Sequence, residues 1–189
     1  LGDGAFLTEL SSRFNYGVDI IEGIALNGAA VSSSNIRELL HSGRCHEANQ
    51  QLGWPYEIGG TVVTGADRGK QLGYPTANLA PAEPRQLVPK FGVYLVSSQI
   101  EGKRVFGICN VGIRPTFNEM QQTIEVHFLE FPDTDLYNRK IQLQFHHRMR
   151  DERKFNSEQE LIARIEQDKS EAVSWISKYM EGAAVDDTV

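Results

Sequence analysis

GADRGKQLGYPTANL, residues 65–79, is a glycine-punctuated basic stretch that ends in two side-chain oxygen donors. Its glycines let the backbone adopt positive φ and approach a ligand closely, and its basic side chains supply positive charge. Its threonine and asparagine offer the hard oxygen atoms that Mg2+ prefers. The residues concerned are Gly65, Gly69, Gly73, Arg68, Lys70, Thr76 and Asn78. Together they predict a site for the phosphates of a magnesium nucleotide.

The same stretch does not fit a Walker phosphate loop. That motif requires a glycine, four residues, and then Gly-Lys-Ser/Thr at the start of a helix. Here Thr64 stands in place of the first glycine, Gln71 takes the Ser/Thr position, and Pro75 interrupts any helix. A different phosphate loop is therefore expected. The alternative is a glycine-rich β-turn with solvated basic side chains, in which Thr76 and Asn78 cap the turn.

Residues 72–79 match, position by position, the Leu-Gly-Phe/Tyr-Pro-Thr-Ala-Asn-Leu signature of the riboflavin kinase family, which the chain therefore resembles. The resemblance implies that Thr76 and Asn78 coordinate Mg2+ and that the loop binds the phosphates of ATP. Lys70 stands where many members have a second arginine, which keeps the charge and loses the bidentate fork. The implied nucleotide-binding and phosphate-binding residues are Gly65, Arg68, Gly69, Lys70, Gly73, Tyr74 and Pro75.

The composition is that of a globular protein with one domain, or with one domain and part of another. A formal net charge of -6 argues against a general nucleic-acid binder, because such proteins present a basic face. Cys45 and Cys109 are too few and too far apart for a zinc site or a disulfide framework, which favours a reducing, cytoplasmic compartment. No run approaches the roughly 20 apolar residues of a membrane helix. The oligomeric state stays open.

The N-terminal part of the chain has a helical pattern of its own. Serines in the segment 31–40 precede a helix with an apolar side, and a second helix is predicted from Cys45 to Leu52. Pro55 disfavours the helical conformation at the residue before it, so helicity ends there. Residues 1–30 suggest that something precedes Leu1 in the full protein. The predicted regions are a partly helical one at 1–55, the main domain at 56–180 and a tail at 181–189.

Ser32, Ser33, Ser34, Ile36 and Arg37 resemble a Ser-Ser-Thr-x-Ile-Arg motif near the end of the α/β nucleotidyltransferase domain of bifunctional FAD synthetases. In that family the domain precedes a riboflavin kinase, so the resemblance implies a remnant of it, with the missing part as a partner in the same polypeptide. An ordinary capped helix is the alternative. Adenylyl transfer requires a His-x-Gly-His-like motif, and none of the 5 histidines lies in one. FMN adenylyltransferase activity is therefore expected only from the full-length protein.

Beyond Tyr56 the apolar residues alternate with polar ones, which predicts strands separated by Gly, Pro, Asn and Asp turns. The candidate strands are 58–64, 92–98, 104–111, 123–129 and 140–146. Their regular spacing predicts a mainly β domain built as a small antiparallel barrel. The resemblance implies a Greek-key-like barrel of about six strands followed by a C-terminal helix. Ser157 and Glu160 form a capping box at the start of that helix.

Alternation in the strand 123–128 places Glu125 on the face away from the core. A solitary glutamate there is ordinarily a solvated surface residue, whereas the resemblance implies the general base that accepts the alcohol proton. His127 shares this face and is expected to be a hydrogen-bonded barrel histidine. The resemblance also implies supporting or flavin-side roles for residues that could otherwise be surface charges or loop anchors. They are Asn110, Arg114, Phe117 and Arg150.

The expected reaction is phosphorylation of the riboflavin 5′-hydroxyl by ATP with Mg2+, giving FMN and ADP. One alternative is a non-catalytic flavin-binding or nucleotide-binding regulatory module, which needs neither a metal pair nor a base. The other is an oligosaccharide-binding or nucleic-acid-binding barrel, which the acidic balance and the lack of an aromatic and basic face disfavour. The expected partners are small-molecule substrates. Neither a nucleic acid nor a membrane is expected as a partner.

Overall fold

The computed structural model describes residues 4–21, 23–26, 28–65, 69, 72–115, 120–131 and 136–186. The chain divides into two compact units, 1–33 and 34–189. In the first unit, helix α1 (Gly4–Phe14) precedes a two-stranded antiparallel hairpin of β1 (Ala25–Leu26) and β2 (Ala29–Ala30). Such a short hairpin is marginally stable in water by itself.

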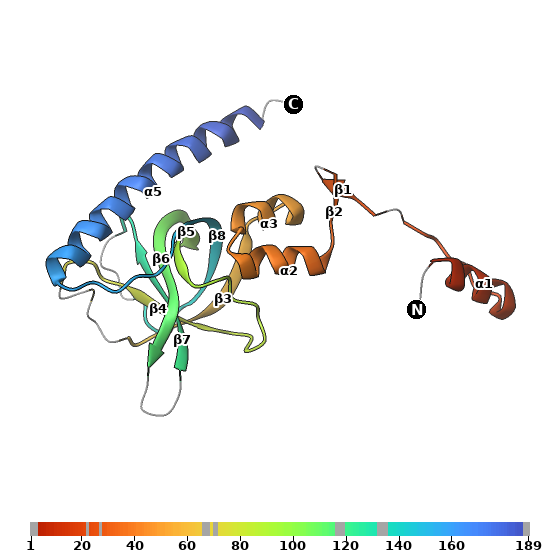
Figure 1. Cartoon of the computed structure of the whole chain (residues 1–189), viewed down its shortest axis with the longest axis horizontal. Helices are drawn as coiled ribbons and strands as arrows, with labels where there is room; N and C mark the ends of the chain where they lie inside the picture. The colour runs from red at the N-terminus through yellow and green to blue at the C-terminus, as the bar shows by residue number, and fades with distance from the viewer. Residues whose placement is uncertain are drawn as a thin grey trace. The chain divides into compact units, whose positions relative to one another are not determined.

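Six antiparallel strands close into a barrel in the second unit (Figure 1). Their order around the barrel is β3-β4-β7-β6-β5-β8. The strands are β3 (Tyr56–Val63), β4 (Ala77–Pro81), β5 (Gly92–Ile100), β6 (Lys103–Pro115), β7 (Met120–Phe128) and β8 (Lys140–Arg150). Strand β8 returns beside β5 after the β5-β6-β7 meander, which is a Greek key. The predicted Greek-key-like barrel is therefore confirmed.

Strand β4 is the barrel strand that the alternation pattern missed. It has five residues, carries little β-branched or aromatic side chain and ends at Pro81, so it lacks the composition typical of strands. Pairing with β3 over four residues and with β7 over two places it in the barrel. Its position decides the site described below, because Ala77 and Asn78 begin this strand.

The inward-facing side chains of the six strands form one apolar core with part of the preceding helices. Tyr94 and Phe145 lie at its centre with their rings edge to face, 5.4 Å apart. Both side chains are fully buried. Burial of such large apolar surfaces is the dominant favourable term in folding.

Helices α2 (Ser33–Ser42) and α3 (Cys45–Leu52) confirm the two helices predicted before Pro55. Their buried residues Leu39, Leu40, Cys45 and Ala48 belong to the same core as the barrel interior. Asn49 also ties α3 to two strands, because its amide donates to the Phe145 carbonyl at 2.7 Å and its oxygen accepts from the Tyr56 amide at 2.8 Å. The domain boundary at residue 55 stays a prediction.

The C-terminal helix α5 (Glu158–Asp186) starts with the predicted capping box. The Glu160 amide donates to Ser157 Oγ at 3.2 Å, and the Glu160 carboxylate accepts from the Asn156 amide at 3.1 Å. The helix was predicted to end at residue 180 but continues to Asp186, so that prediction was too short. Its extra turns include Ala183 and Ala184, which have high helix propensity and offset the cost of Gly182.

Helix α5 packs on the outside of the barrel against β8 and β6. His146 of β8 is 2% exposed, and its ring lies 6.0 Å from Trp175 and 5.3 Å from Tyr179 of the helix. Its Nε2 lies 2.8 Å from Ser97 Oγ. Burial, with a smaller contribution from Arg104, lowers the pKa of His146 to about 4. A neutral, hydrogen-bonded histidine thus joins the helix to the barrel.

Candidate active site

Three polar residues lie side by side on the outer face of adjacent strands. Glu125 of β7 pairs in register with Asn78 of β4 on one side and with Asn110 of β6 on the other. Directly paired residues point to the same side of a sheet. Ile124 and Val126 are buried, so Glu125 points outward, as the alternation predicted. Barrel closure thus joins the candidate base to a candidate metal ligand that lies 47 residues earlier in the chain.

Arg114 of β6 reaches the same carboxylate. Its Nη2 donates to Glu125 Oε1 at 2.6 Å, with side-chain exposures of 41% for Arg114 and 25% for Glu125. A pair this exposed contributes little to stability. The guanidinium can therefore exchange the carboxylate for an anionic ligand at little cost. The supporting role predicted for Arg114 stays a prediction.

Asn110 has a second carboxylate beside it. Its amide Nδ2 donates to Glu152 Oε1 at 3.1 Å. A Cβ at Gly112 would lie 2.8 Å from Glu152 Cδ, so a side chain there would displace this carboxylate. Sequence reasoning did not single out Glu152, which lies in a run of charged residues after β8 with no distinguishing spacing. The site thus has two acidic side chains, one on each side of Asn110.

The side chains of Thr76 and Asn78 are packed against glycines of the preceding loop. A Cβ at Gly65 would lie 2.7 Å from Asn78 Cγ, and a Cβ at Gly69 would lie 3.4 Å from Thr76 Oγ1 and would collide with the Tyr74 carbonyl. The loop therefore needs glycine at these positions to make room for the two oxygen donors. Within the described part of the chain, neither Thr76 nor Asn78 forms a side-chain hydrogen bond of the kind that turn capping requires.

Thr76 and Asn78 form a set of side-chain oxygen donors, and Glu125 lies beside Asn78. Such a set suits Mg2+, which binds few protein ligands and keeps water or phosphate oxygens in its other positions. Among the residues that the structure describes, no group of three or more His, Cys, Asp or Glu side chains could hold a metal ion.

The loop itself makes a tight turn before Thr76. The amides of Leu72 and Tyr74 both donate to the Gly69 carbonyl, at 3.1 and 2.8 Å. Gly73 adopts φ of 84°, a left-handed conformation that favours glycine. Two basic loop residues, Arg68 and Lys70, lie outside the described residues, as does Phe117. Their assigned roles stay predictions.

Arg150 is held by helix α5. Its Nε lies 2.9 Å from Asp168 Oδ1, its Nη2 lies 2.7 Å from Oδ2, and its Nη1 donates to the Asp151 carbonyl at 3.0 Å. Arg164 also donates to Asp168, which is 2% exposed. The guanidinium thus anchors α5 to the end of β8. The flavin-side role assigned to Arg150 stays a prediction.

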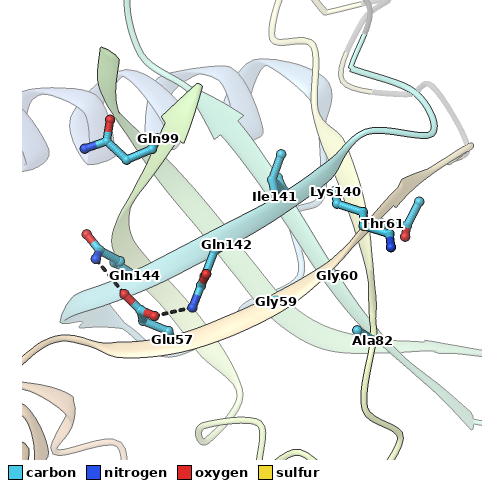
Figure 2. A pocket seen from close by; sticks show the side chains of 10 residues that line it. All are labelled: Glu57, Gly59, Gly60, Thr61, Ala82, Gln99, Lys140, Ile141, Gln142 and Gln144. Atoms are coloured by element: carbon cyan, nitrogen blue, oxygen red, sulfur yellow. Dashed lines mark hydrogen bonds between the residues drawn. The ribbon is translucent and has the colours of Figure 1, made fainter. Parts of the chain in front are cut away.

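A hollow of about 530 Å3 lies on the outer face of β3 and β8 (Figure 2). Gln142 and Gln144 both direct their amides at the Glu57 carboxylate, the latter at 2.6 Å. Strand order places β8 opposite β7, so the hollow and Glu125 lie on different sides of the barrel. We place the chemistry at β4, β7 and β6, because the carboxylate in the hollow already binds two amides.

Both cysteines are buried free thiols. Burial raises the pKa of Cys45 to about 12 and also raises the pKa of Cys109. A nucleophilic thiolate is therefore absent from both positions at neutral pH.

A family model described as flavokinase, riboflavin kinase, matches residues 52–176. The chain belongs to the riboflavin kinase family. It is 39% identical over 164 residues to the bifunctional riboflavin kinase/FMN adenylyltransferase of Bacillus subtilis, an alignment that covers 85% of this chain and 51% of that protein. It is 35% identical over 177 residues to the protein of the same description from Haemophilus influenzae, covering 93% of this chain and 56% of that protein.

The riboflavin kinase-family chain thus spans about half the length of the curated relatives that it matches. It also resembles a crystal structure described as a macrolide-efflux protein from Streptococcus pneumoniae, with a TM-score of 0.81 and 31% identity. That match covers 89% of this chain and 55% of the other. It supports the fold, and the name macrolide-efflux protein belongs to that protein. In the described part of this chain, no helix is long and apolar enough to cross a membrane.

Proposed function

We propose that the chain transfers the γ-phosphate of ATP to the 5′-hydroxyl of riboflavin, giving FMN and ADP. The observation that carries this proposal is the juxtaposition of Asn78, Glu125 and Asn110 on neighbouring strands, in a chain of the riboflavin kinase family. In this proposal Glu125 is the acceptor for the alcohol proton, and Asn78 is an oxygen donor for a metal-bound nucleotide. Phosphoryl transfer to an alcohol needs both.

Glu125 accepts the proton of the riboflavin hydroxyl as the new P–O bond forms. Its outward position and partial exposure leave it accessible to an alcohol. Thr76 and Asn78 hold Mg2+, which offsets the charge of the β- and γ-phosphates. The Arg114 guanidinium pairs with the Glu125 carboxylate before the reaction. During the reaction it moves toward the negative charge that develops on the phosphoryl group. Because the transition state is loose, positioning and charge stabilisation supply most of the catalysis.

The remaining assignments extend this proposal. The loop residues Gly65, Arg68, Gly69, Lys70, Gly73, Tyr74 and Pro75 bind the nucleotide phosphates, and Asn110, Arg114, Phe117 and Arg150 lie toward the flavin. The relatives are bifunctional. We therefore infer that this chain is the kinase part of such a protein in the cytoplasm, and that FAD formation requires an adenylyltransferase part.

Incubation of the purified chain with riboflavin, ATP and Mg2+ tests the activity. FMN, without FAD, should accumulate, and removal of Mg2+ with EDTA should abolish its formation. Chromatographic separation of riboflavin, FMN and FAD measures both. A folded chain that binds riboflavin or ADP but forms no FMN would favour the non-catalytic binding module instead.

Gly65→Ala should weaken the binding of Mg–ADP by roughly tenfold or more, because its Cβ would displace the Asn78 side chain. Isothermal titration calorimetry of Mg–ADP measures the effect. Gly59→Ala is the matched control, because a Cβ there meets no atom within 4 Å. Equal affinities of the two variants would remove Asn78 from the metal site.

A further inference from the structure

His127 lies on the outer face of β7, two residues after Glu125. Its Nδ1 lies 2.8 Å from the carbonyl oxygen of Pro75. A carbonyl oxygen can only accept, so Nδ1 carries the proton and donates it. Pro75 has no amide N–H, which makes this carbonyl its one backbone hydrogen-bonding group. The histidine side chain thus holds the residue that directly precedes Thr76.

The backbone ladder does not reach this point. Among the described residues, strands β4 and β7 pair at Ala77 with Val126 and at Asn78 with Glu125. Asn78 is therefore fixed by the sheet, whereas Thr76 lies just before the first paired residue. The bond from His127 to Pro75 attaches the chain on the other side of Thr76. The two candidate metal ligands are thus positioned by different means: Asn78 by the backbone ladder, and Thr76 by the side chain of His127.

Tyr74 supports the histidine from the loop side. Its ring lies edge to face with the His127 ring, with centroids 5.6 Å apart. Its hydroxyl donates to Glu166 of α5 at 2.6 Å, and Lys169 lies 3.1 Å from the same carboxylate and 5.5 Å over the Tyr74 ring. The hydrogen bond that the Tyr74 hydroxyl donates to Glu166 raises the pKa of that hydroxyl. Tyr74 is therefore held between His127 and helix α5.

We propose that His127 is a positioning residue that sets the Thr76 oxygen for the magnesium nucleotide. The inference rests on the proposed function, since Thr76 is a magnesium ligand only in that reaction. His127 acts through the Pro75 carbonyl and touches neither substrate. Its loss should weaken the magnesium–nucleotide complex, while the proton acceptor Glu125 stays in place on the ladder.

Two substitutions separate the hydrogen bond from the ring contact. His127→Phe keeps an aromatic ring against Tyr74 and removes the donor, whereas His127→Asn removes the ring and keeps an N–H at the same number of bonds from Cβ. The phenylalanine variant should raise the dissociation constant of Mg–ADP roughly tenfold, and the asparagine variant should stay within about threefold of the parent. The KM for Mg–ATP should follow the dissociation constant, with little change in kcat.

Calorimetry of Mg–ADP, together with FMN kinetics, decides the matter, with His41→Asn as a control at an exposed histidine of α2. Equal affinity of the phenylalanine variant and the parent overturns the inference, as does an asparagine variant as weak as the phenylalanine variant. If the parent binds Mg–ADP but forms no FMN, the proposed function fails while calorimetry still tests His127. If the parent does not bind Mg–ADP, both proposals fall.

Discussion

Glu125→Gln is expected to lower kcat for FMN formation by roughly 100-fold, the lower end of the usual contribution of a general base. Glutamine keeps the size of the side chain and an oxygen that can accept from Arg114. It cannot take up the alcohol proton at neutral pH. Because the nucleotide contacts other residues, the dissociation constant of Mg–ADP should stay within about threefold of the parent value.

Steady-state FMN formation and Mg–ADP calorimetry measure the two expectations separately. Glu38→Gln, at an exposed position of α2, controls for the loss of one negative charge. A Glu125→Gln variant with parental turnover would show that the proton leaves without this carboxylate, and would leave Glu125 as an ordinary surface residue.

Asp168→Asn is expected to lower the free energy of unfolding by about 3 kcal/mol, because it removes the anion that two guanidinium groups share in a buried site. Asp168 accepts from Arg150 and Arg164, whose side chains are only 17% and 16% exposed. Asparagine keeps the shape of the side chain and one acceptor oxygen. The lost free energy of unfolding therefore measures mainly the removal of the negative charge. Urea unfolding followed by circular dichroism measures it.

Asp151→Asn is the matched control for that experiment. Asp151 also pairs with an arginine, Arg148, but its side chain is 80% exposed, so solvent replaces the lost interaction. The urea midpoint of this variant should equal that of the parent. Equal stability of the Asp168 and Asp151 variants would contradict the view that α5 is anchored through a buried ion pair.

The outward position of Glu125 could be predicted from the sequence, because alternation of side chains along β7 needs no tertiary information. It could not show that Asn78 and Asn110 lie beside Glu125, because register across a barrel is set by closure and core packing. Strand β4 was missed for a related reason: its five residues have little strand propensity and are held by their neighbours.

The contacts around helix α5 could not be predicted from the sequence either. Arg150 binds Asp168, which is 18 residues away and lies on the helix. Glu152 was passed over within a charged run and proved to lie beside Asn110. A sequence without its fold does not distinguish such residues from solvated charges, because their contacts depend on which helices and strands pack together.

The most direct test of the central claim follows the phosphate itself. The purified chain would be incubated with riboflavin, Mg2+ and ATP labelled in its γ-phosphate, and the products separated by chromatography. Direct γ-phosphoryl transfer predicts label in FMN, with one ADP formed for each FMN and no FAD. Label released only as inorganic phosphate, or a folded chain that leaves riboflavin unlabelled, would contradict it.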